Sequence, residues 1–432
     1  MFSLNPKNWF KEKESKKGET KSAYLPLEQG SFLEYALGSP GATISAQMAN
    51  GFYRNTSAIA TAVDMIADSV KLVQPVIEDS EGKIITDHEI IRFLKKPNGM
   101  NLYHDFMGTL ARNYLLKHDS LITCVGNIKR PPIEIWPVSY QEVSVLENLD
   151  TYPDAYIVPT GSVTGTFTRS TDRKLGTKFY DGNLKEIYHI KGFSSERNNI
   201  QSDSPLQASA NEARQIIKGK LHNLSLLDNG GRLSLLISFN DEDMITESEH
   251  DQRKQRIQED FGGNAGKIGV ISGADISSVK EFGVNNKDMD YAELETFAGY
   301  AIYLRYNVPL ALVTNDAATF NNMQTGIELL YDMAIIPLAN ILFEGLSDLL
   351  LHRFGLDPKK FKITYNPESI DALKKRKIEE VKKRQEIGVE TDNELRSLLP
   401  NREPVEGGDV LYKSSNFLPI GTDLYTDDNN AT

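Results

Sequence analysis

The first regular element of the chain is marked by apolar residues at helical spacing. Residues 57–73 carry an apolar side chain at every third or fourth position, which predicts an amphipathic helix. Pro75 stops the pattern, because proline cannot continue a helix. Two short apolar runs, 76–78 and 83–85, flank the turn residues 79–82. This arrangement predicts a hairpin directly after the helix.

A second helix and a series of short strands are predicted before residue 190. The helix covers 102–116 and follows the turn Pro97-Asn98-Gly99. Apolar runs bounded by turn residues indicate strands, and they occupy 120–127, 133–138, 142–146 and, divided by Gly and Asp, 151–190. The first half of the chain therefore predicts the α+β class with a largely antiparallel sheet.

Two long helices separated by a small insert are predicted in the middle of the chain. Ser204-Pro205 opens the first helix, which runs to about Leu227 and ends at Asn229-Gly230-Gly231, a typical helix end. The second covers 291–306 and stops before Pro309. The insert contains a charged helix near 247–261 between strands at 233–239 and 267–271. Together they predict a stalk with an α/β tip.

The most apolar part of the chain lies within 326–354, where a further long helix is predicted. It carries the acidic residues Asp332, Glu344 and Asp348, which a helix that spans a bilayer rarely tolerates together. We therefore interpret it as a buried or amphipathic helix of a soluble assembly. Pro337 lacks an amide donor, so we expect a break or kink there.

Polar and charged residues predominate on both sides of this helix. The Asn-rich stretch 314–322 before it predicts a polar loop. After it, 373–386 predicts a helix with seven basic and three acidic side chains. Gly388 follows, and a short helix over 392–399 ends at Pro400.

Composition and charge limit the possible functions. The chain has 432 residues, of which 40% are hydrophobic, so it can bury a large core in several structural units. Its net charge of -12 argues against a protein that grips nucleic acid over its whole surface. The single cysteine, Cys124, excludes an internal disulfide framework and fits a reducing cytoplasm. Residues 1–22 are rich in Lys and Glu without an apolar run, which predicts a disordered arm and not a signal peptide.

Sequence motifs for catalysis or metal binding are incomplete. The seven histidines are widely spaced, so a metal site built on neighbouring histidines is not expected. Residues 262–267 resemble a phosphate loop, but the loop is one residue short and Ile268 replaces the Ser or Thr that would bind magnesium. The acidic run 241–243 lacks the glycine and closing glutamate of a calcium loop, and 161–165 is not a nucleophile elbow. We predict no catalytic residue, no metal and no cofactor, and hence not an enzyme.

A basic run between residues 374 and 384 has two interpretations. Its lysines could contact DNA, but Glu379, Glu380 and Glu386 lie close by and can pair with them along a helix. We favour a solvated charged face. The residues of the possible basic face are Lys374, Lys375, Lys382 and Lys383.

Five stretches in this order resemble the portal proteins of tailed phages typified by HK97, and together they span about 50–412. The stretches are Tyr53-Arg54-Asn55 with the helix that follows, His88 with Leu94-Lys95-Lys96-Pro97-Asn98, Ser204-Pro205-Leu206 with the helix to Asn229-Gly230-Gly231, Tyr306-Asn307-Val308-Pro309 with the loop to Asn322, and 388–396 through Gly407-Gly408-Asp409. One departure is Lys117-His118-Asp119-Ser120, where many relatives carry a turn like Gly-Asn-Ala-Tyr.

The resemblance implies a division of the chain into the parts of a portal subunit. The portal fold has an α/β wing, a two-helix stem, a small α/β clip, a tunnel loop with a long kinked helix, and a helical crown. The expected parts are a disordered arm at 1–29, the wing at 30–203, the stem helices at 204–230 and 284–308, the clip at 231–283, the tunnel loop at 309–325, the long wing helix and return strand at 326–367, the crown at 368–413 and a flexible acidic tail at 414–432.

The resemblance also implies a function and its site residues. A ring of identical subunits, typically twelve, would sit at one capsid vertex of the virion after assembly in the host bacterial cytoplasm. It would pass double-stranded DNA and contact the major capsid protein, the terminase large subunit and a head–tail adaptor, with no membrane. The tunnel-loop residues expected nearest DNA are Asn315, Thr319, Phe320, Asn321, Asn322 and Gln324. The clip residues expected to face terminase and adaptor are Glu247, Glu249, Gln252, Lys254, Gln255 and Gln258.

Two alternatives belong to other classes of protein. A capsid or scaffold subunit would form a shell lattice in place of a small closed ring. A nucleotide-dependent packaging enzyme would need a complete phosphate loop or a clustered set of carboxylates, and the sequence contains neither motif.

Overall fold

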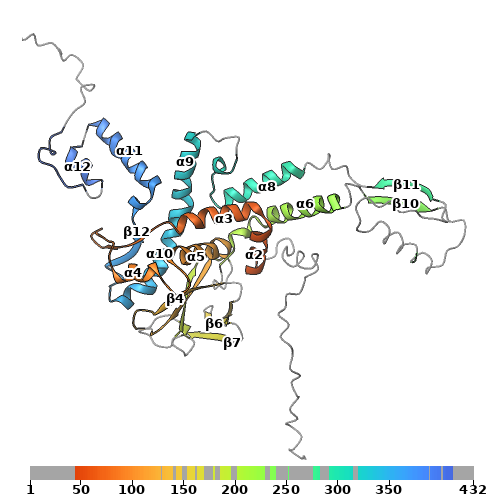
Figure 1. Cartoon of the computed structure of the whole chain (residues 1–432), viewed down its shortest axis with the longest axis horizontal. Coiled ribbons are helices and arrows are strands. Elements are labelled where there is room, and N and C mark those ends of the chain that lie inside the picture. The colour runs from red at the N-terminus through yellow and green to blue at the C-terminus, as the bar shows by residue number, and fades with distance from the viewer. Residues whose placement is uncertain are drawn as a thin grey trace, which may run out of the picture.

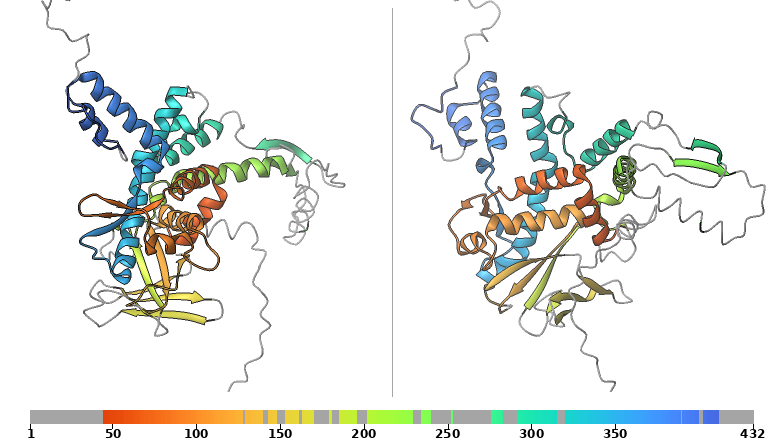
Figure 2. Two further views of the ribbon diagram at one scale, coloured as in Figure 1. Left: turned by 60° about the vertical axis from the view of Figure 1, so that its left-hand side comes forward. Right: turned by 45° about the vertical axis from the view of Figure 1, so that its right-hand side comes forward.

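The body of the protein combines helices with two antiparallel sheets, and a pair of helices projects from one side of it (Figure 1). The long apolar helix crosses this body, and the C-terminal helices extend from another side (Figures 1 and 2). The computed structural model describes residues 44–127, 129–139, 143–147, 153–160, 163–169, 179–180, 185–195, 202–228, 234–239, 252, 276–282, 291–314, 320–388, 390–399 and 402–411. The predicted N-terminal arm and acidic tail lie outside these residues.

Three helices from the N-terminal half form the centre of the core. They are α2 (Ala46–Asn55), α3 (Ser57–Val70) and α5 (Tyr103–Lys117). The apolar stripe of α3 is buried against α5 and the long helix, which confirms the helix predicted there. The sequence pattern did not reveal α2, which begins where the Ser45 hydroxyl accepts a hydrogen bond from the Met48 amide.

Among the described residues the larger sheet has seven strands, and every neighbouring pair is antiparallel. α5 packs near β3 and β4, and the long helix packs near β9. The prediction of a largely antiparallel sheet is therefore confirmed. In spatial order the strands are β4 (Glu134–Val138), β3 (Asp119–Val125), β9 (Lys185–Lys191), β8 (Phe179–Tyr180), β7 (Val163–Arg169), β6 (Pro153–Thr160) and β5 (Ser144–Glu147).

A smaller sheet pairs strands that lie far apart in the sequence. β1 (Pro75–Asp79) pairs with β2 (Ile84–Ile85) in the predicted hairpin and, on its other side, with β12 (Phe361–Tyr365). Pro75 both ends the helical pattern and starts β1, a position at which a strand tolerates proline. A short helix, α4 (Glu89–Lys95), follows the hairpin and begins at His88, whose Nδ1 accepts a hydrogen bond from the Ile90 amide.

The projecting pair consists of α6 (Ala210–Asp228) and α8 (Tyr291–Arg305), which lie side by side (Figures 1 and 2). β10 (Ser234–Phe239) and β11 (Ile276–Phe282) form an antiparallel ribbon beyond the end of the pair. The helix predicted to start at Ser204 is divided, because a 3₁₀ turn over Pro205–Gln207 precedes α6. The strand predicted at 233–239 is confirmed, β11 was not predicted, and the strand at 267–271 and most of the helix at 247–261 lie outside the described residues.

The long helix starts earlier than predicted and is interrupted before Pro337. α9 (Phe320–Leu330) continues through a π turn (Tyr331–Ile335) into α10 (Ile336–Leu350) and a final 3₁₀ turn (Leu351–Phe354). The Ile336 amide donates to the Tyr331 carbonyl, so the turn contains one extra residue. This extra residue is a common cause of a helix bend, and it lies where proline would clash with the preceding turn.

The interpretation of this stretch as a buried helix agrees with its packing. By length and composition alone, Asn322–Phe354 could cross a membrane. In the structure, the large apolar side chains of α10 lie in the main core, among them Leu342, Phe343, Leu346 and Leu349.

Two helices form the C-terminal part of the described chain. α11 (Asp371–Ile387) ends at Gly388, which adopts a left-handed conformation with a φ of 70°. α12 (Asp392–Ser397) begins with a capping box in which Thr391 and Glu394 bond reciprocally. Both predicted helices and the glycine between them are thus observed.

Candidate functional site

The base of the α6–α8 pair is tied to the body by hydrogen bonds to backbone carbonyls. Arg305 Nε donates to the Pro205 carbonyl over 2.9 Å, Tyr306 Oη donates to Leu115 over 3.1 Å, and Ser204 Oγ donates to Leu116 over 2.6 Å. Farther along the pair, Lys220 Nζ lies 3.5 Å from Glu295 Oε1. Tyr306 and Ser204 therefore join the base of the pair to the last turn of α5, and Arg305 and Lys220 join the two sides of the pair to each other.

The polar loop predicted at 314–322 ends earlier than expected, because α9 begins at Phe320. Phe320, Asn321, Asn322 and Gln324 belong to the first turns of this helix, whereas Asn315 and Thr319 lie outside the described residues. Asn322 is exposed, and Gln324 Nε2 donates to Glu328 Oε1 over 3.1 Å. The structure thus shows helix at residues 320–325, where a loop was expected.

Gly326 of α9 packs closely against the Leu312 side chain. A 3₁₀ turn (Leu310–Leu312) follows α8, and a Cβ atom at Gly326 would lie 3.2 Å from Leu312 Cδ2. A larger residue at 326 would therefore require the Leu312 side chain to shift.

Of the six predicted clip residues, only Gln252 is described, and it is exposed. Glu247, Glu249, Lys254, Gln255 and Gln258 lie outside the described residues. Their proposed contact with partners stays a prediction.

The four lysines of the possible basic face are all exposed on α11. The arginines beside them bind carboxylates: Arg384 contacts Glu380 at 2.8 Å and Glu390 at 2.9 Å, and Arg376 pairs with Asp332 of the π turn. The acidic partners thus come partly from α11 itself and partly from outside it. This arrangement agrees with a solvated charged face and leaves contact with DNA untested.

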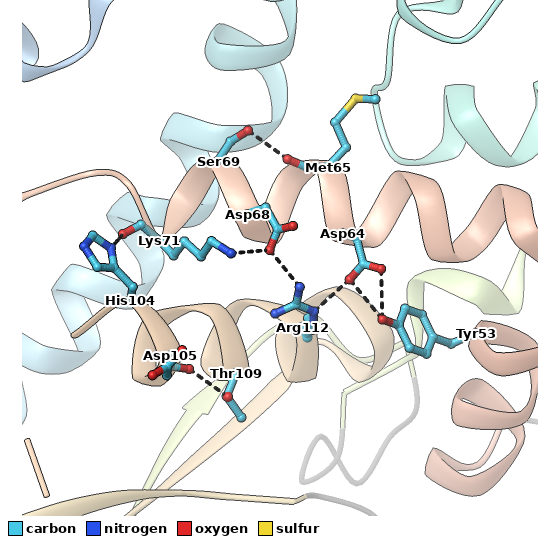
Figure 3. Close-up of polar contacts among 10 residues, drawn as sticks. All are labelled: Tyr53, Asp64, Met65, Asp68, Ser69, Lys71, His104, Asp105, Thr109 and Arg112. Carbon is cyan, nitrogen blue, oxygen red and sulfur yellow. Dashed lines mark hydrogen bonds and ion pairs between the residues drawn. The ribbon is translucent and has the colours of Figure 1, made fainter. Parts of the chain in front are cut away.

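A half-buried polar cluster joins α2, α3 and α5, as Figure 3 shows. Arg112 Nε lies 2.8 Å from Asp64 Oδ1, and Arg112 Nη2 lies 2.7 Å from Asp68 Oδ1. Tyr53 Oη donates to Asp64 over 2.9 Å, and Lys71 Nζ donates to Asp68 over 2.9 Å. The hydrogen bond from Lys71, together with Arg112, lowers the pKa of Asp68. Asp64 and Asp68 are four residues apart on one helix, a signal that our sequence analysis missed.

A buried polar network surrounds Asp119, at the start of β3. His189 Nε2 and Ser202 Oγ bind Asp119 Oδ1 over 2.8 and 2.7 Å, and the Ser202 amide binds Oδ2 over 2.9 Å. The other ring nitrogen of His189 contacts Tyr156 Oη at 2.8 Å. Burial raises the pKa of Asp119, but these hydrogen bonds outweigh it and leave the pKa below its usual value. The network contains no exposed nucleophile, and it fixes the segment that leads to α6.

His118 occupies the turn at which the sequence departs from many portal proteins. It caps α5 in the left-handed conformation, with a φ of 58°, which Asn and Gly adopt more readily than other residues. Gly192 fits closely against it, because a Cβ there would lie 2.7 Å from the His118 carbonyl oxygen. The unusual sequence is therefore compatible with a left-handed turn.

The substitution His118→Asn is expected to reduce the loss of stability between pH 7 and pH 5. Burial, and the charge of Arg305, lower the pKa of His118 despite the opposing carboxylates of Asp119 and Asp203. The unfolded chain then binds a proton below about pH 6.5 that the folded chain resists, so stability falls as the pH falls. Urea unfolding at both pH values would measure this loss, and an equal loss in both proteins would contradict the assignment.

Within the part of the chain that the structure describes, no three His, Cys, Asp or Glu side chains gather to hold a metal ion. The polar clusters around Arg112 and Asp119 join helices and strands of the body to one another.

Comparisons with known proteins agree on one family. The family model described as phage portal protein matches residues 57–399. A protein of Rickettsia bellii is 26% identical over 330 residues, covering 74% of this chain and 80% of its own. The portal protein of Escherichia phage T5 is 30% identical over 190 residues, covering 42% of each chain.

Solved structures show the same fold at low sequence identity. A chain in the neck of a native gene transfer agent particle, computed with C12 symmetry, aligns with a TM-score of 0.58 and 20% identity, over 87% of this chain and 99% of its own. An HK97 family phage portal protein from Corynebacterium diphtheriae aligns with a TM-score of 0.50 and 12% identity, over 77% and 98%. With a family model that covers most of its length, this chain belongs to the phage portal protein family.

Proposed function

We propose that this protein forms a closed ring at one vertex of a tailed phage capsid and that double-stranded DNA enters and leaves through the ring. The observation that supports this most is the order of elements: two adjacent helices with a ribbon beyond their end, then a short segment and a long interrupted helix. A related neck particle was computed with twelve-fold symmetry. Cyclic symmetry would bring identical loops together around one axis.

The proposed parts follow the described elements. α6 and α8 would be the stem, β10 and β11 part of the clip, and α11 and α12 the crown. The two sheets and the central helices would form the wing. The segment from η5 (Leu310–Leu312) to the first turns of α9 would be the tunnel loop, with Asn322 and Gln324 among the residues nearest DNA.

Weak attraction to DNA would suit this role. A protein that neutralises many phosphates releases many counterions and binds tightly. The net charge of -12 instead favours a channel along which DNA slides. The ring would act structurally and would leave ATP hydrolysis to the terminase, in keeping with a family that is structural.

The partners would differ between the two ends of the ring. The clip would bind the terminase large subunit during packaging and the head–tail adaptor afterwards, and the wing would contact the major capsid protein. The assembled ring would belong to the virion, after assembly in the host cytoplasm. A capsid or scaffold subunit is the alternative, and it predicts a different assembly.

Negative-stain electron microscopy with mass photometry would test the ring. The full-length protein would be examined at several concentrations, alone and after co-expression with the major capsid protein of the same phage. Annular particles of about twelve subunits with a central channel are expected. Shells, filaments, or a compact dimer under all of these conditions would overturn the proposal.

A further inference from the structure

α8 has apolar side chains on two opposite sides. On one side Ala298 and Ile302 are buried against the rest of the chain. On the other, Leu294, Phe297 and Leu304 are 40%, 61% and 60% exposed. Large apolar side chains on both sides of a helix are normally both covered, and among the described residues nothing covers the exposed side of α8.

The exposed residues form a regular stripe. Leu294, Phe297, Ala301 and Leu304 are all exposed and follow one another at intervals of three, four and three residues. This is the spacing with which one helix packs along another. Glu295 faces α6 through its ion pair with Lys220. Phe297 lies two residues later, about 200° around the helix axis, so the stripe points away from α6.

The outward face of α6 carries a charge opposite to that of the outward face of α8. Lys218 precedes Lys220 by two residues, so it also points away from its own partner helix, about 200° around α6. Lys218 and Leu221 are exposed there, whereas the exposed end of α8 carries Glu293. Within the chain, a base of α6 already pairs with an acid of α8. The outward faces offer the same combination of charges to another copy.

We propose that the outward stripe of α8 packs against the outward face of α6 in the adjoining copy of the chain. The inference rests on the proposed ring and assigns one of its subunit contacts. Each copy would use two different surfaces, as a head-to-tail interface that closes into a ring requires. Glu293 of one copy would lie beside Lys218 of the next. Because α6 leads outward and α8 leads back, Phe297 and Leu304 would then cover the aliphatic stems of exposed residues that precede Lys218 on α6, such as Gln215.

Two features of the outward stripe of α8 favour a second copy of the chain as its partner. DNA is a poor fit, because phosphate contacts need basic side chains. The stripe instead offers apolar side chains and the carboxylate of Glu293. A long stripe at helix-packing intervals fits a straight helix, and α6 presents one with the matching charge.

The substitution Phe297→Glu tests the stripe in the full-length chain. A charge at the centre of an apolar helix contact should raise the concentration for half-maximal ring assembly by about 30-fold or more, the effect expected at an interface hot spot. Phe193→Glu is the control for a charge placed at an exposed aromatic position, because Phe193 is 73% exposed and belongs to neither α6 nor α8. Mass photometry and electron microscopy would be used, with circular dichroism to confirm equal helix content. Equal assembly by Phe297→Glu and the wild type would overturn the proposal.

A charge exchange tests the choice of α6 as partner. Lys218→Glu and Glu293→Lys should each weaken assembly by about 5-fold through repulsion of like charges, and the double variant should restore it. Phe297→Glu could disrupt rings while the double charge exchange weakens assembly as much as its two single substitutions combined. In that case the pairing with α6 is wrong. If the wild type never forms rings, alone or with capsid protein, the proposed function itself fails. Wild-type rings that the stripe variants leave intact would reject only this interface.

Discussion

Replacing Glu186 with alanine is expected to lower the free energy of unfolding by about 3–5 kcal/mol, the usual effect of breaking a buried ion pair. Glu186 lies on β9 and pairs with Arg353 in the last turn of the long helix. Both side chains are 1% exposed, so alanine would leave the guanidinium buried without this carboxylate. Urea unfolding at pH 7, followed by circular dichroism, would measure the change.

The double variant Glu186→Leu with Arg353→Met is the control for this prediction. It removes both charges and keeps apolar volume, so its stability should be within about 1 kcal/mol of the wild type, or higher. Two results would contradict the prediction: a loss below about 1 kcal/mol for the single variant, or a double variant as unstable as the single one. Either would show that the ion pair contributes less to the free energy of unfolding than its burial indicates.

Replacing Asp119 with alanine is expected to cost about 3 kcal/mol, because it removes charge-assisted hydrogen bonds and leaves buried donors without an acceptor. The donors are His189, Ser202 Oγ and the Ser202 amide. Since the folded pKa of Asp119 is depressed, its stabilisation is complete above its unfolded value near pH 3.9 and is lost as the pH falls through the folded value. Unfolding measured at pH 7 and at decreasing pH should therefore show the two proteins converge in acid.

Asp105→Ala is the matched control, since Asp105 is an exposed aspartate in the first turn of α5. Its loss should cost under about 1 kcal/mol, through the helix dipole alone. If both substitutions cost the same, the buried network around Asp119 does not stabilise the fold.

Local patterns in the sequence predicted the elements whose structure depends on nearby residues. Three such patterns determine the structure of residues close to them in sequence, and all three predicted elements are observed. They are the apolar stripe of α3, the β1–β2 turn and the glycine after α11. The left-handed His118 could not be read from the sequence, because histidine adopts this conformation less often than Asn or Gly. Its close fit with Gly192 depends on residues far apart in the chain.

The start of α9 shows why part of the candidate site could not be predicted. Asn and Phe at 320–322 have modest helix propensity, so the local sequence favoured a loop. The helix extends through them in a region where Gly326 meets Leu312, a tertiary contact without a sequence signal. The exposed stripe of α8 was overlooked for another reason: the sequence shows where apolar residues lie along a helix, but not which of its sides the chain itself covers.

The pairing of β1 with β12 sets the order in which the protein can be completed during synthesis. Pro75 pairs with Tyr365, so nearly all of the chain must leave the ribosome before the small sheet can close. β10 and β11 need only residues close to each other and can form earlier. Until β12 arrives, one edge of β1 is open to pairing with another chain, and a nascent chain that stalls before residue 361 would be prone to aggregation.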